Sequence, residues 1–215
     1  RNKTGFVVVF VPPSNDPKLL WKDYDSAIDL ASRQWRFQNI VVPLTSLSKK
    51  CKGTFYLPQR SDAITFVRGR DVFPDLYDGI NLRSIDIREL YRKIDQPHMF
   101  DGLSAPTQGL KYAQEWISKN HIKDPIVTIS IRDSEFDKAR NSNIDAWSKF
   151  AIYLKSKGYY PVVIPDTDVA FDEDHRFDEV MVFRECAWNI GLRISLHELA
   201  FLNFQIFVSS LCEDV

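Results

Sequence analysis

The clearest pattern along the chain is an alternation of apolar runs with amphipathic stretches after residue 125. Residues 126–131 are continuously apolar and β-branched, which is typical of a strand buried on both faces. Residues 144–157 repeat apolar side chains at helical spacing before Gly158, and residues 160–164 form a second apolar run. Strand, helix and strand in this order predict a parallel sheet with right-handed crossovers.

The alternation continues towards the end of the sequence. We expect a third strand at 180–183, a helix over 188–203 and a fourth strand at 206–208. A doubly wound half usually adds further helices and strands after such a strand. The sequence therefore predicts an α/β fold with Rossmann-like parallel sheets, and a C-terminal half that is incomplete at Val215.

The first part of the chain is patterned less regularly. Residues 6–11 read as a central strand, residues 24–37 as a helix and residues 40–42 as a short strand stopped by Pro43, which together make a βαβ unit. We expect a further helix at 60–66.

A domain boundary is expected near residue 105. A strand at 80–84 and a helix at 86–94 precede the segment 96–106, whose prolines and small polar residues are typical of a linker. A helix capped by Thr107 is expected to run to about residue 120. We therefore predict an N-terminal α/β half over 1–105 and a C-terminal Rossmann-like half over 106–215.

Composition narrows the class of partner. The 28 basic and 29 acidic side chains nearly cancel, so no overall field favours nucleic acid or an anionic membrane surface. No apolar run approaches the roughly 20 residues that span a bilayer. The cysteines are odd in number and share no short spacing, which favours reduced thiols and a cytoplasmic location.

The loop after the strand at 126–131 is the first candidate site, because ligands of open parallel sheets collect beyond the carboxyl ends of the strands. Arg132 and Arg140 each offer a guanidinium fork for phosphate, and the start of the next helix favours an anion. Alternatively, the arginines pair with Asp133, Glu135 or Asp137 in an ordinary polar loop. The candidate phosphate-binding residues are Arg132, Arg140, Asn141, Ser142 and Asn143.

Three other regions carry candidate polar groups. Asp166 and Thr167 follow the strand at 160–164 and suit ribose or base hydroxyls, or else form a turn and a helix cap. Ser209 and Ser210 follow the last expected strand and suit a phosphate. The helix at 188–203 carries the remaining candidates, which are Arg193, His197 and Glu198. For Arg193 the alternative is a partly buried ion pair, and for His197 a satisfied core or surface histidine.

Several well-defined chemistries leave no trace in the sequence. The dinucleotide, Walker, nucleophile-elbow and zinc-protease motifs do not occur. The Asp-x-Asp pairs that begin at Asp166 and Asp172 are compatible with a magnesium site. We expect no bound metal and no cofactor.

The blocks that carry the C-terminal pattern resemble a family of bacterial glycosyltransferases of the two-domain GT-B type. The resemblance covers residues 125–208, and the strand that ends in Arg132 is similar in outline to fucosyltransferases, with Ser130 where their histidine stands. The matching blocks are Thr128-Ile129-Ser130-Ile131-Arg132-Asp133, Ala139-Arg140-Asn141-Ser142-Asn143, Tyr160-Pro161-Val162-Val163-Ile164-Pro165-Asp166-Thr167 and Ala187-Trp188-Asn189-Ile190-Gly191-Leu192-Arg193, with Glu198.

The resemblance implies transfer of a sugar from a nucleotide-sugar donor, held by the C-terminal half, to an acceptor held by the N-terminal half. Arg132 would contact the donor phosphate, and the block from Arg140 to Asn143 would shape the same pocket. Asp133 and Glu135 are the candidate bases. The alternative hypothesis is a non-catalytic Rossmann-like module that binds a nucleotide, a sugar or a protein.

Overall fold

The chain divides into two compact units. The structure is a computed structural model and describes residues 5–12, 28–73, 103–136, 138–172 and 177–205. The first unit comprises Arg1–Ser26 and Ser48–Leu103, and the second comprises Ala27–Leu47 and Ser104–Val215. The second unit is therefore discontinuous in sequence, because residues 27–47 group with the part after residue 104.

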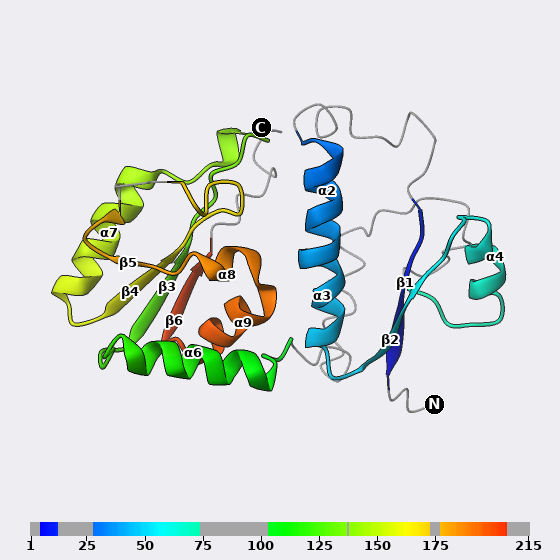
Figure 1. Cartoon of the computed structure of the whole chain (residues 1–215), viewed down its shortest axis with the longest axis horizontal. Coiled ribbons are helices and arrows are strands. Elements are labelled where there is room, and N and C mark those ends of the chain that lie inside the picture. Colours follow the sequence, from blue (N-terminus) through cyan, green and yellow to red (C-terminus); the bar gives the residue numbers. More distant parts are fainter. Residues whose placement is uncertain (1–4, 13–27, 74–102, 137, 173–176, 206–215) are drawn as a thin grey trace, which may run out of the picture. The chain divides into compact units, whose positions relative to one another are not determined.

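The second unit is built on a parallel sheet (Figure 1). Its described strands are β3 (Ile126–Ser130), β4 (Tyr160–Ile164), β5 (Met181–Val182) and β6 (Leu202–Gln205). They lie side by side in the order β5-β4-β3-β6. The predicted α/β class and parallel sheet are confirmed, and the sheet is compatible with a Rossmann-like fold.

Helices cover both faces of this sheet, so that its central strands are buried on both sides. Helix α7 (Ile144–Ser156) packs with Val127, Ile129 and Val163 in one core cluster. Helices α6 (Thr107–Lys119) and α9 (Ile190–Leu199) pack on the opposite face with Ile126, Val162 and Ile164. This two-sided burial explains why β3 and β4 read as continuous apolar runs rather than alternating ones.

Local signals set the ends of helix α7 as expected. The side chain of Asn143 accepts a hydrogen bond from the backbone N–H of Ala146, which satisfies one of the free donors of the first turn. Gly158 follows the helix with a φ of 81°, a left-handed conformation that side chains with a Cβ adopt at a cost. At helix α6 the expected cap is shifted by one residue, because Pro106 is the N-cap and Thr107 the first helical residue.

Two predicted elements of the second unit are wrong. Residues 40–42, expected as a strand, are helical, because α2 (Leu30–Arg36) continues through η2 (Phe37–Val41), α3 (Val42–Leu44) and η3 (Thr45–Leu47). Pro43 does not interrupt this run, since it stands in the first turn of α3, where a missing N–H is tolerated.

The helix expected over residues 188–203 is broken in two places. Helix α8 (Glu185–Trp188) ends at Asn189, whose side chain caps α9 by accepting from the N–H of Leu192. Residues 202–205 form β6 instead of the helix end, and the strand expected at 206–208 lies outside the described residues. The apolar period cannot separate a helix from a short buried strand here.

The first unit contains a two-stranded parallel sheet of β1 (Phe6–Phe10) and β2 (Cys51–Tyr56), with α4 (Asp62–Val67) following. β2 was not predicted, while the helix expected at 60–66 is present. The elements expected at 80–84 and 86–94 lie outside the described residues. Within the described part of the chain, no helix combines the length and apolarity needed to cross a membrane.

Candidate functional site

The order of the strands identifies the edge at which a ligand is expected. The chain moves outward from β3 to β4 and β5, then returns to place β6 on the other side of β3. The strand order therefore reverses between β3 and β6, and the crevice beyond their carboxyl ends is where such sheets bind ligands. Ser130 and Gln205, paired in register, end the two strands.

The loop that follows β3 is held together by Arg132. Its guanidinium donates to the side-chain oxygen of Asn141 and, at 2.6 Å, to the carbonyl of Phe136. Its backbone N–H donates to the Ser142 hydroxyl at 2.8 Å, and its carbonyl accepts from the N–H of Ser142 at 2.8 Å. Arg132 thus fixes the shape of the loop with the same guanidinium that the sequence assigned to phosphate.

Asn141 is the second anchor of this loop. Its side-chain oxygen also accepts from the N–H of Ser134 at 3.1 Å, and its amide donates to the carbonyl of Ser134 at 3.0 Å. Ser134 is buried. The interaction of Asn141 with both Arg132 and Ser134 makes the loop a cross-linked turn and not an open polar segment.

We expect Asn141→Ala to lower the free energy of unfolding by about 1–3 kcal/mol, because it leaves buried donors of the loop without an acceptor. Urea denaturation measures the change. Asn143→Ala is the matched control, since it removes only the cap bond to Ala146 and is expected to cost about 1 kcal/mol. Equal costs for the two variants would contradict a special role for Asn141.

The other polar residues of the loop are placed differently. Glu135 is exposed and forms a 2.7 Å ion pair with Lys138, which raises the pKa of that lysine through a hydrogen bond and through charge. Arg140 is partly buried, and Asn143 serves as the helix cap. Asp137 lies outside the described residues. Glu135 therefore pairs with Lys138 and not with an arginine, while Arg132 bonds to Asn141 and Phe136.

The loop after β4 is joined to the loop after β3. One carboxylate oxygen of Asp166 accepts from the N–H of Asp133 at 3.1 Å, and the other accepts from the N–H of Asp168 at 3.3 Å. Thr167 donates its hydroxyl to the carbonyl of Ala187 at 3.2 Å. The structure thus brings together the first two candidate loops, at the carboxyl ends of adjacent strands.

An aromatic group borders the second loop. Trp188 forms edge-on contacts with Trp35 and Phe171, at centroid distances of 5.1 and 4.7 Å, and its indole N–H donates to the carbonyl of Thr167. Arg36 forms an ion pair with Asp168 beside it. Trp188 and Phe171 remain 42% and 59% exposed, so aromatic surface is available next to the candidate site.

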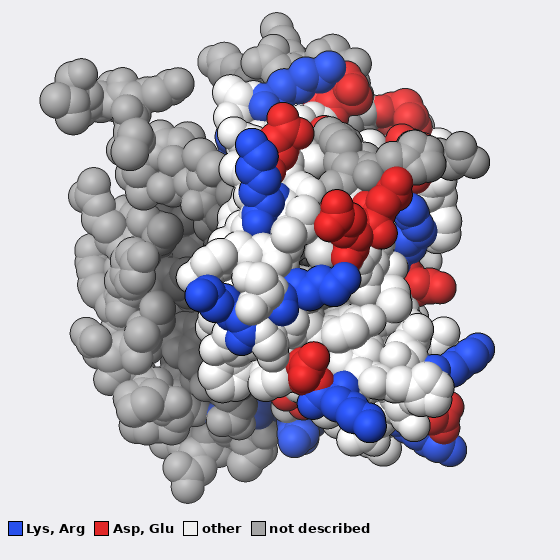
Figure 2. Space-filling model, turned by 90° about the vertical axis from the view of Figure 1, so that its left-hand side faces the viewer, with Lys and Arg blue, Asp and Glu red and all other residues white. Residues whose placement is uncertain are grey.

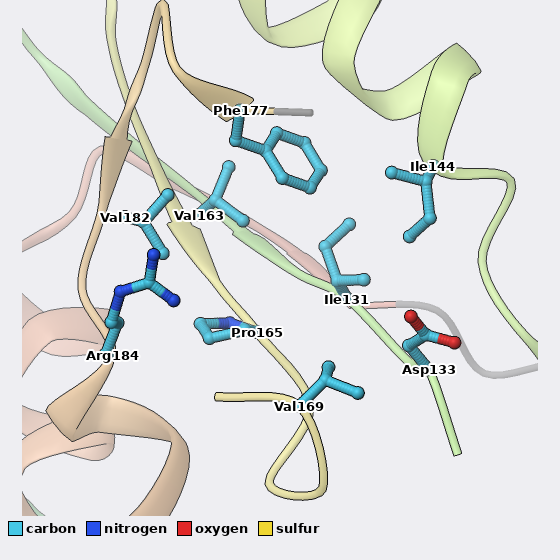
Figure 3. Close-up of a pocket in the computed structure, with 9 residues that line it drawn as sticks. All are labelled: Ile131, Asp133, Ile144, Val163, Pro165, Val169, Phe177, Val182 and Arg184. Atoms are coloured by element: carbon cyan, nitrogen blue, oxygen red, sulfur yellow. The ribbon is translucent and has the colours of Figure 1, made fainter. Parts of the chain in front are cut away.

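The cavity at the carboxyl ends of β3, β4 and β5 is small. It measures about 20 Å³, enough for about one water molecule, and Figure 3 shows Asp133 and Arg184 on opposite sides of it. Its other lining residues are mainly apolar: Ile131, Ile144, Val163, Pro165, Val169, Phe177 and Val182. The α7 face of this edge is therefore filled by side chains.

A larger hollow of about 460 Å³ lies beside β5. Tyr160 and Pro161, at the start of β4, help to line it, so it is not at the carboxyl ends of the strands, where a ligand is expected. On the face of the molecule drawn in Figure 2, basic and acidic side chains of the described residues are interspersed, without a continuous patch of one sign. Among those residues no group of three metal-ligating side chains is found. Local polar groups, rather than a broad field, must therefore select any ligand.

Helix α9 carries the remaining candidates. Glu198 accepts the backbone N–H of Ala105 at 2.6 Å, which ties it to the start of α6. Arg193 is partly buried and makes no ion pair within the described residues, so the ion pair considered from the sequence is not present there. His197 is also partly buried, and burial, followed by the charge of Arg193, lowers its pKa to about 4.

Sequence reasoning missed two polar residues at the reversal between β3 and β6. Ser130 was noted only as a departure from fucosyltransferases, and Gln205 was not singled out. The signal was available, since Asn203 and Gln205 alternate with apolar neighbours. Ser209 and Ser210 lie outside the described residues. Comparisons with protein-family models, curated proteins and solved structures give no significant match, so the geometry of the site must support any functional proposal.

Proposed function

We propose that the chain is a glycosyltransferase whose second unit binds a nucleotide-sugar donor at the carboxyl ends of β3, β4 and β6. One observation carries the proposal: the polar loops after β3 and β4 are cross-linked, through Asp133 and Asp166, beside the reversal of the strand order. Open parallel sheets bind nucleotides at this position. In the GT-B arrangement proposed here, the first unit supplies the acceptor side.

The chemistry of transfer requires stabilisation of the negative charge that develops on the leaving diphosphate. Arginine side chains supply the compensating positive charge. They do so best when they are held in place before the reaction, because fixed charges need no reorganisation during it. Arg132 is fixed by its bonds to Asn141 and Phe136. Arg140, in the same loop, is the second proposed phosphate ligand.

Of the two proposed bases, Asp133 is the better placed. It is partly buried, follows β3 closely and lines the small cavity at the carboxyl ends of β3, β4 and β5. Glu135 is exposed and engaged with Lys138. We therefore assign activation of the acceptor hydroxyl to Asp133, and a role on the surface of the loop to Glu135.

A thermal-shift screen with nucleoside diphosphates and nucleotide sugars tests donor binding. A ligand present at about 100 times its dissociation constant stabilises the folded state by about 2.7 kcal/mol. We expect Arg132→Ala to abolish the shift and Arg132→Lys to restore little of it, because lysine lacks the two-pronged geometry. Arg68→Ala, an exposed arginine of the first unit, is the control. A full shift in Arg132→Ala would contradict the assigned role.

Product formation distinguishes the enzyme from the second candidate, a non-catalytic nucleotide- or sugar-binding module. The ion pair of Glu135 with Lys138 favours this second candidate, because it occupies one of the two proposed bases. Mass spectrometry of donor and acceptor pools after incubation gives the answer. Tight nucleotide binding with neither hydrolysis nor transfer would support the binding module.

A further inference from the structure

A polar stripe lies on the face of the sheet on which α9 packs. Thr128 and Ser130 of β3 alternate with Val127 and Ile129, which pack towards α7, so they face the other way. Asn203 and Gln205 are their register partners on β6. We call Thr128, Ser130, Asn203 and Gln205 the polar stripe.

Thr128 and Asn203, the half of the stripe farther from the carboxyl ends of the strands, find hydrogen-bond partners within the protein. The hydroxyl of Thr128 donates to the side-chain oxygen of Asn203, whose amide donates to the carbonyl of His197 at 3.1 Å. This pair therefore needs no ligand. The upper half, at the carboxyl ends of the strands, is different.

Three buried side-chain atoms, one on β3 and two on α9, have no hydrogen-bond partner among the described residues. They are the hydroxyl oxygen of Ser130, Nε of Arg193 and Nε2 of His197. Native proteins leave few buried polar atoms unpaired, and each such atom needs an explanation. Gln205, the register partner of Ser130, contacts His197, and Arg193 stands one turn before His197 on α9. The three atoms therefore indicate a common missing partner.

All three atoms can donate, and two have no other role. Nε of an arginine is only a donor. The amide nitrogen of Gln205 lies 3.3 Å from Nδ1 of His197, and we assign this contact to donation by the amide, which makes Nδ1 the acceptor. The proton of the neutral imidazole is then on Nε2. Donors without acceptors call for an acceptor-rich ligand.

Charge supports the same conclusion. The pKa of Arg193 is lowered, first by burial, while Cys186 and Asp166 act in the opposite direction. Asp166 is held at both oxygens by the N–H groups of Asp133 and Asp168. The positive charge of Arg193 is therefore partly desolvated without a paired carboxylate, and such a charge destabilises a fold unless an anion binds it.

Few other ionisable groups lie on the elements packed around Arg193 and His197. Within their bounds α3, β3 and β6 carry no acidic, basic or thiol side chain. Helix α8 contributes Cys186 and Glu185, and on α6 Lys111 and Glu115 pair with each other at the surface. His197 and Arg193 both keep some exposed surface, so the place they occupy is not sealed.

We propose that Ser130, Arg193 and His197 form a binding site for a phosphoryl group at the reversal between β3 and β6, with Gln205 setting the tautomer of His197. Resting on the proposed function, this site takes the phosphate nearest the sheet in the donor diphosphate. Binding of phosphate alone does not depend on sugar transfer, so the two proposals fail separately.

The imidazole signals of the full chain in two-dimensional nitrogen–proton NMR test the site, with inorganic phosphate and pyrophosphate as probes. His197→Gln identifies the signal of His197 among the four histidines. An anion beside the ring favours the imidazolium, so we expect the probes to shift this signal and to raise its pKa from about 4 towards 6.5. An unchanged signal and pKa would overturn the proposal.

Variants separate a binding role from a structural one. Arg193→Met and Ser130→Ala are expected to weaken phosphate binding, by about 10-fold or more for Arg193→Met, while the thermal midpoint stays constant or rises. Arg68→Met is the matched control, expected to bind as the wild type does. A lower midpoint in both variants would assign the cluster to the fold and overturn the proposal.

Two further outcomes distinguish the ligand and the function. An equal response to acetate would overturn the phosphoryl assignment in favour of a carboxylate. A response of His197 to pyrophosphate without binding of any nucleotide sugar would support this site and contradict the proposed function. Nucleotide-sugar binding that leaves the His197 signal unchanged would do the reverse.

Discussion

Phe183→Ala is expected to lower the free energy of unfolding by about 3–5 kcal/mol, the largest effect we anticipate for a single substitution. Phe183 is fully buried, and its ring stacks on Trp116 of α6 with centroids 4.1 Å apart and an angle of 9° between the planes. Its removal leaves a cavity between α6 and the sheet. Urea denaturation followed by tryptophan fluorescence measures the loss.

Phe171→Ala is the matched control, since Phe171 contacts Trp188 at the surface and is 59% exposed. We expect it to cost less than about 1 kcal/mol. Similar losses for the two variants would show that the α6 face does not form the main core of the second unit.

Gly109→Ala is expected to destabilise the second unit by about 1–3 kcal/mol, although alanine ordinarily favours a helix. A Cβ at Gly109 would overlap the hydroxyl of Ser195 on α9 and lie 3.1 Å from the carbonyl of Gly191. Ser195 is itself buried and donates that hydroxyl to Gly191 at 2.7 Å. The two helices therefore approach closely only because small residues stand at this contact.

A double-mutant cycle tests this explanation. Ser195→Ala removes the hydroxyl that the new methyl group would meet, so Gly109→Ala should cost less in the Ser195→Ala background than in the wild type. Denaturation midpoints of the four proteins give the coupling. Additive effects would mean that α6 tolerates a Cβ at this position without contact with Ser195.

Much of the second unit follows from local sequence. The strand pair β3 and β4 and the helix α7 between them were predicted within one residue, because continuous apolar runs, a capping asparagine and Gly158 all favour the same arrangement. The break after Trp188 was missed, although Asn189 is a good N-cap, because the apolar period continues through it. The parallel pairing of β1 with β2 depends on a partner distant in sequence, and β2 itself has mixed polarity.

The candidate site was predicted in part for the same reason. Sequence placed Arg132 and Asp166 after adjacent strands, which is enough to bring their loops to one edge. It did not reveal that Arg132 is committed to Asn141, nor that Asp166 accepts from Asp133, since hydrogen-bond partners depend on how the loops fold.

The sequence by itself determined the α/β class, the order of β3, α7 and β4, and the edge of the sheet where polar residues gather, because apolar period and capping act over a few residues. Only the tertiary structure decided the return of the chain that places β6 beside β3. That pairing sets Gln205 beside Ser130 and brings its amide to 3.3 Å from Nδ1 of His197. The pairing joins residues 75 positions apart, as Thr128 and Asn203 are, and no local pattern encodes it.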